Sequence, residues 1–328
     1  MADLSTTYMG LKLKNPIVVS SSDLTATLSG IKKCEDAGAG AVVMKSLFEE
    51  QFWIREEEET PEYAVYPEAL DYMRSGGLLE YAPDKICGMI EDIKKAVDIP
   101  VISSINCRHE KLWPRFARQC EQAGADALEL NIYFLPMEIQ TAGSEYEDHH
   151  LRIFREVKKE LSIPISVKLT HQITAVPHLG QNLAKAGCLG LVLFNWFMEP
   201  DIDIDNMAAK NLKGKGDLGT CLRWTALTAG RLDCDIAASG GVQSSGDVIK
   251  LLLAGASVVQ VCSLLYQKGV EEIKNLLQGL ETWMDAHRNS EIEDFRGEMS
   301  FKNQELRFRD LGEAQAFFRA QYLKAYTK

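Results

Sequence analysis

One short phrase recurs four times along the chain and constrains the fold more than any other feature. In each copy a helical stretch ends in Ala-Gly, and a short apolar run follows directly. The four runs are AVVMKS, ALELN, LGLVLFN and SVVQVCS. Glycine suits the left-handed position that closes a helix, and a continuous apolar run is typical of a strand that is covered on both faces. The repeated phrase therefore predicts helices that alternate with buried parallel strands.

Eight strands of this kind can be placed in the sequence. Besides the four repeated runs, NPIVVSSS opens the series, IPVISSIN and IPISVKL begin after proline, and DIAASGG precedes the last repeat. The predicted strands are 16–20, 41–45, 100–105, 127–131, 164–169, 189–194, 235–239 and 257–262. This order predicts an α/β fold, the parallel (β/α)8 TIM barrel. An open doubly wound sheet is the alternative, but polar residues at the end of every strand favour closure.

Two loops and a tail depart from the repeat. An insertion at Phe48–Ala82 follows the second strand, and its acidic run Glu56–Glu59 indicates a solvated surface. A loop at Ile132–Asp148 follows the fourth strand, and loops of this length are usually lids or binding loops. The barrel is expected at about 15–265 and the C-terminal helices at about 266–328, within one domain spanning 1–328. The tail helices are predicted at 265–286, 290–297 and 311–326.

Composition narrows the class of protein. A net charge of −11 argues against a nucleic-acid-binding surface or an anionic membrane partner. The eight cysteines form no C-x-x-C pair, which indicates a reducing compartment rather than a disulfide scaffold or an iron–sulfur protein. No apolar run approaches the roughly 20 residues that span a bilayer, and Met1–Asn15 lacks the pattern of a signal peptide. We therefore expect a cytoplasmic protein that acts on a small molecule.

The stretch Asp235–Ser263 carries the clearest signal for a ligand. Its two strands end at Ser239-Gly240-Gly241 and at Cys262-Ser263. Glycine lets the backbone approach a ligand closely, and a helix N-terminus attracts an anion. In a barrel, these ends would form the phosphate site that follows strands seven and eight. We interpret them as the anchor of a phosphorylated cofactor; the alternative is that the glycines only make tight turns.

Polar residues end the other strands as well. Those expected at the C-terminal face are Ser20, Ser21, Lys45, Ser46, Asn106, Asn131, Lys168 and Asn195. This set is rich in hydrogen-bond donors, and it suits a flat heteroaromatic cofactor with many acceptors. Lys168 is our candidate to stabilise the negative charge of a reduced flavin. We expect no metal site, because the histidines lack the usual zinc spacing.

The motifs ALELN, SVKL, ASGGV and ASVVQVCS, in that order, resemble the dihydroorotate dehydrogenase family of FMN barrels. The resemblance extends from Asn15 to about Gly269. The runs INCRHEKLWPRFARQCEQAGADALELN and ASVVQVCS are also similar to the FMN domain of dihydropyrimidine dehydrogenases. The resemblance implies an FMN-dependent oxidoreductase of pyrimidine metabolism that oxidises a CH–CH bond by hydride transfer to FMN. It also implies a cytoplasmic homodimer of the soluble class.

The resemblance further implies which residues hold the cofactor. Ser20 and Ser21 match the family's flavin-contacting pair, and Lys168 matches its flavin lysine. The two glycine and serine turns, Ser239-Gly240-Gly241 and Cys262-Ser263, match its phosphate cradle. The cofactor half of the family's site is therefore expected in this chain.

Other positions match residues that the family uses for its substrate. Lys45-Ser46 matches a Lys-Ser pair whose lysine reaches both flavin and substrate, which makes Lys45 a candidate for catalysis as well as for binding. Asn131 matches an asparagine that touches flavin and pyrimidine, and Asn195 matches a substrate asparagine. Arg74 replaces a further substrate asparagine and is a candidate to hold a carboxylate.

The departures from the family fall in the loop after the fourth strand. The family places a cysteine or a serine there as the base that removes a proton from dihydroorotate. Phe134 stands at this position and cannot accept a proton, and Pro136 replaces a pyrimidine-binding asparagine. The cofactor half is therefore retained, whereas the pyrimidine half is rebuilt.

Three hypotheses remain open from the sequence. The first is a flavoenzyme with a substrate other than dihydroorotate, in which Tyr133 relays a proton or forms an aromatic wall; Glu138 and His149 are weaker candidates for the base. The second is dihydroorotate oxidation with a base supplied from elsewhere in the loop. The third is a flavin-binding module with no reductive half-reaction of its own.

Overall fold

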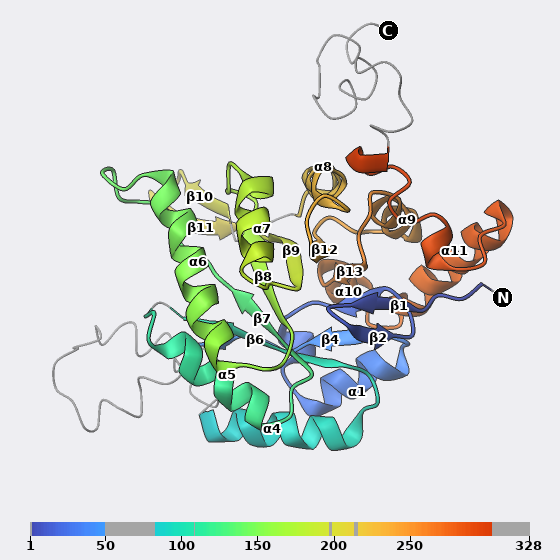
Figure 1. The fold of residues 1–328 in the computed structure, drawn as a ribbon, viewed down its shortest axis with the longest axis horizontal. Helices are drawn as coiled ribbons and strands as arrows, with labels where there is room; N and C mark the ends of the chain where they lie inside the picture. Colours follow the sequence, from blue (N-terminus) through green and yellow to red (C-terminus); the bar gives the residue numbers. More distant parts are fainter. Residues whose placement is uncertain (1, 50–82, 108, 197–198, 213–215, 304–328) are drawn as a thin grey trace, which may run out of the picture.

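Parallel strands form a closed barrel at the centre of the molecule (Figure 1). The computed structural model describes residues 2–49, 83–107, 109–196, 199–212 and 216–303. The barrel strands are β3 (Ile17–Val19), β4 (Ala41–Val43), β6 (Val101–Asn106), β7 (Ala127–Asn131), β8 (Ile165–Thr170), β9 (Gly190–Asn195), β12 (Asp235–Ser239) and β13 (Val258–Val261). Their order is β4-β3-β13-β12-β9-β8-β7-β6, and β4 also pairs with β6, which closes the sheet. The predicted TIM barrel is confirmed, and each strand overlaps one of the eight predicted strands.

Helices cover the outside of the barrel and alternate with its strands (Figure 1). They are α1 (Leu28–Asp36), α4 (Pro83–Ala96), α5 (Leu112–Gln122), α6 (Gly143–Glu160), α7 (Val176–Lys185), α8 (Leu218–Thr228) and α9 (Ser245–Leu253). The glycines of the repeated phrase, Gly38, Gly124, Gly187 and Gly255, have φ values from 92° to 108°. Glycine adopts this left-handed conformation without a steric penalty. The helix ends predicted from the phrase are confirmed.

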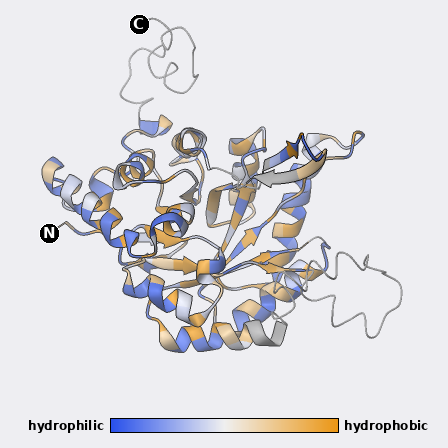
Figure 2. Ribbon diagram, turned by 180° about the vertical axis from the view of Figure 1, so that it is seen from behind, coloured by the Kyte–Doolittle hydropathy of each residue, from blue (hydrophilic) through white to orange (hydrophobic). Residues whose placement is uncertain are grey.

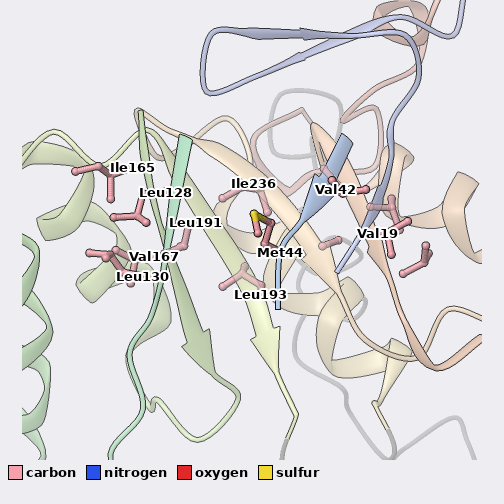
Figure 3. Packing of buried hydrophobic residues seen from close by; sticks show 14 of the residues in the cluster. Val19, Val42, Met44, Leu128, Leu130, Ile165, Val167, Leu191, Leu193 and Ile236 are labelled. Atoms are coloured by element: carbon pink, nitrogen blue, oxygen red, sulfur yellow. The ribbon is translucent and has the colours of Figure 1, made fainter. Parts of the chain in front are cut away.

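Apolar side chains fill both faces of the barrel wall. Leu128, Ile165 and Leu191 belong to a cluster that also contains helix residues and therefore lies between sheet and helices (Figure 3). Their strand neighbours Ala127 and Val192 belong to a second cluster inside the barrel. Successive strand residues point to opposite faces, so strands that are buried on both sides read as continuous apolar runs. Figure 2 shows this pattern as hydrophobic colouring along the barrel strands.

A hairpin that was not predicted packs against the interior of the barrel. It consists of β1 (Thr6–Tyr8) and β2 (Leu11–Leu13), which pair antiparallel. Tyr8 is fully buried in the interior cluster, and the backbone N–H of Met9 donates to Asp235 Oδ2 at 2.7 Å. Asp235 opens β12, so the hairpin lies at the N-terminal end of the barrel, opposite the strand ends that carry the predicted site.

The loop after β7 is shorter than the predicted 132–148. Helix α6 begins at Gly143, because the Glu145 carboxylate accepts a hydrogen bond from the backbone N–H of Ala142 at 3.0 Å and caps the helix. A second hairpin, β10 (Glu199–Asp203) with β11 (Ala208–Leu212), follows β9 and was not predicted. The short strand β5 (Leu47–Phe48) pairs with β6. Residues 50–82 of the predicted insertion lie outside the described residues.

The tail begins with the predicted helices, with one interruption. The stretch predicted as one helix at 265–286 forms α10 (Ser263–Lys268) and α11 (Glu272–His287), because Gly269 adopts a φ of 89° between them. A 3-10 turn, η3 (Ile292–Asp294), lies within the stretch predicted at 290–297. The helix predicted at 311–326 lies outside the described residues. Within the described ranges, no helix is both long and apolar enough to cross a bilayer.

The contact between the turn that precedes β4 and the segment that precedes β3 can be tested with a pair of glycine substitutions. A Cβ at Gly40 would lie 2.1 Å from the carbonyl oxygen of Asn15, whereas one at Gly88 in α4 would meet no atom within 4 Å. We expect Gly40→Ala to destabilise the fold by about 1–3 kcal/mol through overpacking. Gly88→Ala should stabilise it by about 0.5–1 kcal/mol, since alanine favours a helix. Denaturant unfolding of both variants measures the difference, and equal stabilities would contradict the packing described.

Candidate active site

One cavity at the C-terminal end of the barrel brings most of the predicted site residues together. The predicted residues that line it are Ser20, Ser21, Lys168, Asn195, Ser239, Gly240, Gly241, Cys262 and Ser263. They come from the ends of β3, β8, β9, β12 and β13, which are neighbours in the barrel. Parallel strands present their carboxyl ends at one face, where ligands of such barrels bind.

Lys168 lies at the floor of this cavity among three acceptors. Its Nζ donates to Ser20 Oγ at 3.1 Å and to Gln260 Oε1 at 3.2 Å, and it lies 3.5 Å from Glu129 Oε1. Only 7% of the Lys168 side chain and 1% of the Glu129 side chain are exposed. The Lys168 ammonium therefore donates two hydrogen bonds and forms an ion pair with Glu129, and these three contacts hold it in place.

The glycine turn after β12 is built against a tryptophan that the sequence analysis did not single out. Gly240 and Gly241 have φ values of 130° and 75°. A Cβ at Gly240 would lie 2.0 Å from the indole nitrogen of Trp196, which donates to the Ser239 carbonyl at 2.9 Å. Trp196 also stacks on His171, with ring centroids 4.5 Å apart. These contacts explain why the turn requires glycine, and the role of the turn in holding phosphate stays a prediction.

Three asparagines at the ends of neighbouring strands bond to one another. Asn195 Nδ2 donates to Asn131 Oδ1 at 2.8 Å, and Asn106 Nδ2 donates to the Asn131 carbonyl at 2.9 Å. No other described residue bonds to the amide nitrogen of Asn131 or to the amide oxygen of Asn195. The pair therefore presents an amide NH2 group and an amide carbonyl acceptor.

Lys45 and Ser46, from the loop after β4, join the site through different partners. Ser46 Oγ lies 3.1 Å from Ser21 Oγ and 2.7 Å from Ser104 Oγ, in a chain of three hydroxyl groups. Lys45 Nζ bonds to Asp23 Oδ1 at 2.5 Å; the Lys45 side chain is partly exposed, and that of Asp23 is exposed. Asp23 was not predicted as part of the site, and its charge offsets that of the lysine.

The loop after β7 turns its phenylalanine toward helix α6. The ring of Phe134 lies 4.2 Å from that of His149 and 5.8 Å from that of His150, measured between centroids. Phe134 lines a second cavity of about 200 Å³ together with His150 and Thr170. The side chain at the position of the family's base therefore packs on α6. Tyr133, its neighbour, is half-buried.

The remaining titratable groups near the site are weak bases or poor nucleophiles. Burial raises the pKa of the Cys262 thiol, so this thiol stays protonated near neutral pH. Burial lowers the pKa of both His149 and His150. Within the described part of the chain, no group of three or more His, Cys, Asp or Glu side chains could hold a metal ion. Arg74 lies outside the described residues.

Two residues that the prediction missed, Glu129 and Gln260, carried a signal in the sequence. Each is a single polar residue inside an apolar strand, in ALELN and SVVQVCS. Both are almost fully buried, and Gln260 Nε2 donates to Glu129 Oε2 at 2.7 Å. A buried polar side chain needs a hydrogen-bond partner. A single polar residue inside an apolar strand therefore indicates a position where the interior of the barrel holds a polar network.

Fold and cavity together define a (β/α)8 barrel with a ligand site at the C-terminal ends of its strands. Residues 3–284 match the dihydroorotate dehydrogenase family, and the chain belongs to this family. It is similar to the catalytic subunit of dihydroorotate dehydrogenase B (NAD(+)) from Thermoplasma acidophilum, with 27% identity over 308 residues that cover 90% of this chain and 99% of the relative. The corresponding subunit from Methanocaldococcus jannaschii is 28% identical over 306 residues, covering 90% and 97%.

Similarity extends to a second kind of pyrimidine enzyme. The chloroplastic dihydropyrimidine dehydrogenase (NADP(+)) of Arabidopsis thaliana is 25% identical over 328 residues, which cover 90% of this chain and 76% of the relative. These relatives are oxidoreductases that act on CH–CH groups, and membership of the family makes this chain an oxidoreductase of the same kind. The predicted resemblance is confirmed.

The buried histidine behind Phe134 should make the stability of the fold depend on pH. His150 is 2% exposed, and burial lowers its pKa below the usual value of about 6.5. The unfolded chain then binds more protons than the folded chain just below this value, so the free energy of unfolding should fall as the pH drops from about 7 to about 5. His150→Gln should flatten this part of the profile, measured by denaturant unfolding. His178→Gln, at an exposed position of α7, is the control and should leave the profile unchanged.

Proposed function

We propose that the chain is an FMN-dependent oxidoreductase that oxidises a CH–CH bond of a small cyclic amide. The observation that carries this proposal is the buried Lys168 at the floor of the polar cavity, surrounded by strand-end donors. A cation fixed in this way suits the flavin edge on which negative charge develops during reduction. When bound, FMN would accept the hydride from the substrate carbon.

The donor set of the cavity fits such a cofactor. Ser20, Ser21 and Lys168 would hold the ring, with Lys45, Ser46, Asn106 and Asn131 beside it. Ser239-Gly240-Gly241 and Cys262-Ser263 would hold the phosphate at the ends of β12 and β13. A ring with several carbonyl and nitrogen acceptors matches side chains that mainly donate. The barrel would then be a single FMN-binding domain.

The asparagine pair supports a cyclic amide as the substrate class. The amide N–H groups of Asn131 and the amide carbonyl of Asn195, to which no other described residue bonds, are complementary to the carbonyl and N–H of a lactam, as in a dihydropyrimidine ring. Lys45 and Arg74 are the proposed cationic contacts for the same substrate. The relatives named as dihydroorotate and dihydropyrimidine dehydrogenases act on rings of this kind.

Removal of a proton from the substrate is the step in which this chain must differ from the family's pattern. Phe134 cannot accept a proton and packs on α6, so the acceptor must be another group. Tyr133 is the nearest candidate in the loop, although a phenol is a poor general base without help from its surroundings. We therefore propose that dihydroorotate is a poor substrate. The homodimer and the cytoplasmic location stay predictions from the resemblance.

The proposed function can be tested through the colour of the purified protein. We expect a yellow protein whose visible spectrum is that of bound FMN. Under anaerobic conditions, dihydroorotate should bleach this spectrum slowly, because a missing general base costs roughly 10² to 10⁴ in rate. The related catalytic subunit of dihydroorotate dehydrogenase B from Thermoplasma acidophilum serves as the control for rapid bleaching.

Other outcomes of this experiment are equally informative. Rapid bleaching by dihydroorotate would contradict the changed substrate and require a proton acceptor elsewhere in the site. A flavin that neither dihydroorotate nor other dihydropyrimidines reduce would favour the binding module without a reductive half-reaction. A colourless protein that does not bind added FMN would contradict the proposal.

A further inference from the structure

The ion pair between Lys168 and Glu129 lies inside the barrel, directly beneath the proposed cofactor site. Glu129 is 1% exposed and Lys168 is 5% exposed. Gln260 bridges the two, because its Oε1 accepts from Lys168 Nζ and its Nε2 donates to Glu129 Oε2 at 2.7 Å. The amide of Gln260 is thereby held in one orientation, and the two charges lie in a fixed arrangement.

Glu129 has fewer hydrogen bonds than a buried carboxylate usually requires. Its Oε1 is fully buried, accepts no hydrogen bond from the described residues, and faces Lys168 Nζ at 3.5 Å. Below it, burial and then the negative charge of Glu129 raise the pKa of Tyr8 well above its ordinary value, so the tyrosine stays neutral. Lys168 is therefore the cation that offsets the charge of Glu129.

Stability alone does not account for such a pair. Removing two charges from water is costly, and well-packed apolar residues in place of a buried ion pair are often neutral or stabilising. Other inward-facing strand positions, such as Ile102, Val192 and Val258, are buried apolar residues of the interior cluster, so the interior of this barrel packs well with apolar side chains. The pair is therefore better explained by the field that it creates at the floor of the cavity.

We propose that Glu129 is the counter-charge that sets how strongly Lys168 favours the reduced cofactor. Lys168 lines the cavity, whereas Glu129 lies behind it and does not reach the lining. Glu129 thus acts on the cofactor through the field of the ion pair and through the placement of the lysine, and it is a positioning residue rather than a catalytic one. This inference rests on the proposed function, since it needs FMN in the cavity.

The sign of the effect follows from the charges. Reduction places negative charge on the flavin, and a nearby cation stabilises that charge. Glu129 cancels part of the field of Lys168 because the two lie within the same low-dielectric interior. Removal of the carboxylate charge should therefore raise the midpoint potential of the flavin, whereas removal of the lysine charge should lower it.

The experiment compares midpoint potentials of the FMN-loaded protein, measured by anaerobic titration against a redox dye. Glu129→Gln keeps the shape of the side chain and removes its charge. We expect the ratio of reduced to oxidised flavin at a given potential to rise about tenfold, which corresponds to about 30 mV for a two-electron couple. Lys168→Met should shift the ratio in the opposite direction.

A double variant protects the test against a failure of Glu129→Gln to fold. Glu129→Gln combined with Lys168→Met leaves no uncompensated charge, and its potential should lie above that of Lys168→Met alone. Glu121→Gln is the matched control, because this carboxylate accepts from the Ser162 backbone N–H at 2.8 Å at the other end of the barrel. The control should leave the potential unchanged.

The measured potentials distinguish an electrostatic role of Glu129 from a purely structural one, and both from a failure of the FMN proposal. A fall in potential in Glu129→Gln, parallel to that in Lys168→Met, would show that the carboxylate only holds the lysine in place and would overturn the inference. Yellow variants with unchanged potentials, in the single and the double comparison, would also overturn it and leave the FMN proposal intact. A wild-type protein without flavin would overturn the proposed function and the inference together.

Discussion

Closure of the sheet is the constraint on which the site depends. The pairing of β4 with β6 completes a ring of strands, so that residues far apart in the sequence reach the same level of the barrel. Asn131 lies opposite Lys168 in the register of β7 and β8, and Ser239 lies opposite Gln260 in the register of β12 and β13. A shift of one residue in either pair would turn these side chains to the other face. The network around Lys168 therefore depends on the placement of β3, β7, β8 and β13 relative to one another.

The parts of the site that lie on strands could be predicted from the sequence. An apolar run bounded by a glycine cap and a polar residue fixes where a strand begins and ends, since both signals are local. Ser20, Lys168 and Ser239 were placed at strand ends in this way, and all three line one cavity. Their partners could not be predicted, because the bond from Lys168 to Gln260 joins residues that are 92 positions apart.

Contacts between loop residues that shape the site escaped prediction for the same reason. Trp196 stacks on His171 and bonds to Ser239, and Lys45 bonds to Asp23. Each contact joins two segments whose relative placement only the closed barrel determines. The N-terminal hairpin is a similar case, because Tyr8 is buried by strands that follow it in the sequence. The local sequence pattern predicts the secondary-structure elements, whereas the contacts between loops depend on the assembled fold.

The packing of the loop after β7 indicates that a single substitution at Phe134 would not restore the family's proton acceptor. Phe134 packs against α6 through the rings of His149 and His150. A smaller residue at this position would inherit a backbone that directs its side chain toward those histidines and the second cavity. Burial lowers the pKa of His150, so a neutral imidazole fits this apolar contact better than a charged one. The phenylalanine and the histidines thus form one packed unit, and a family-type base would require the unit to change as a whole.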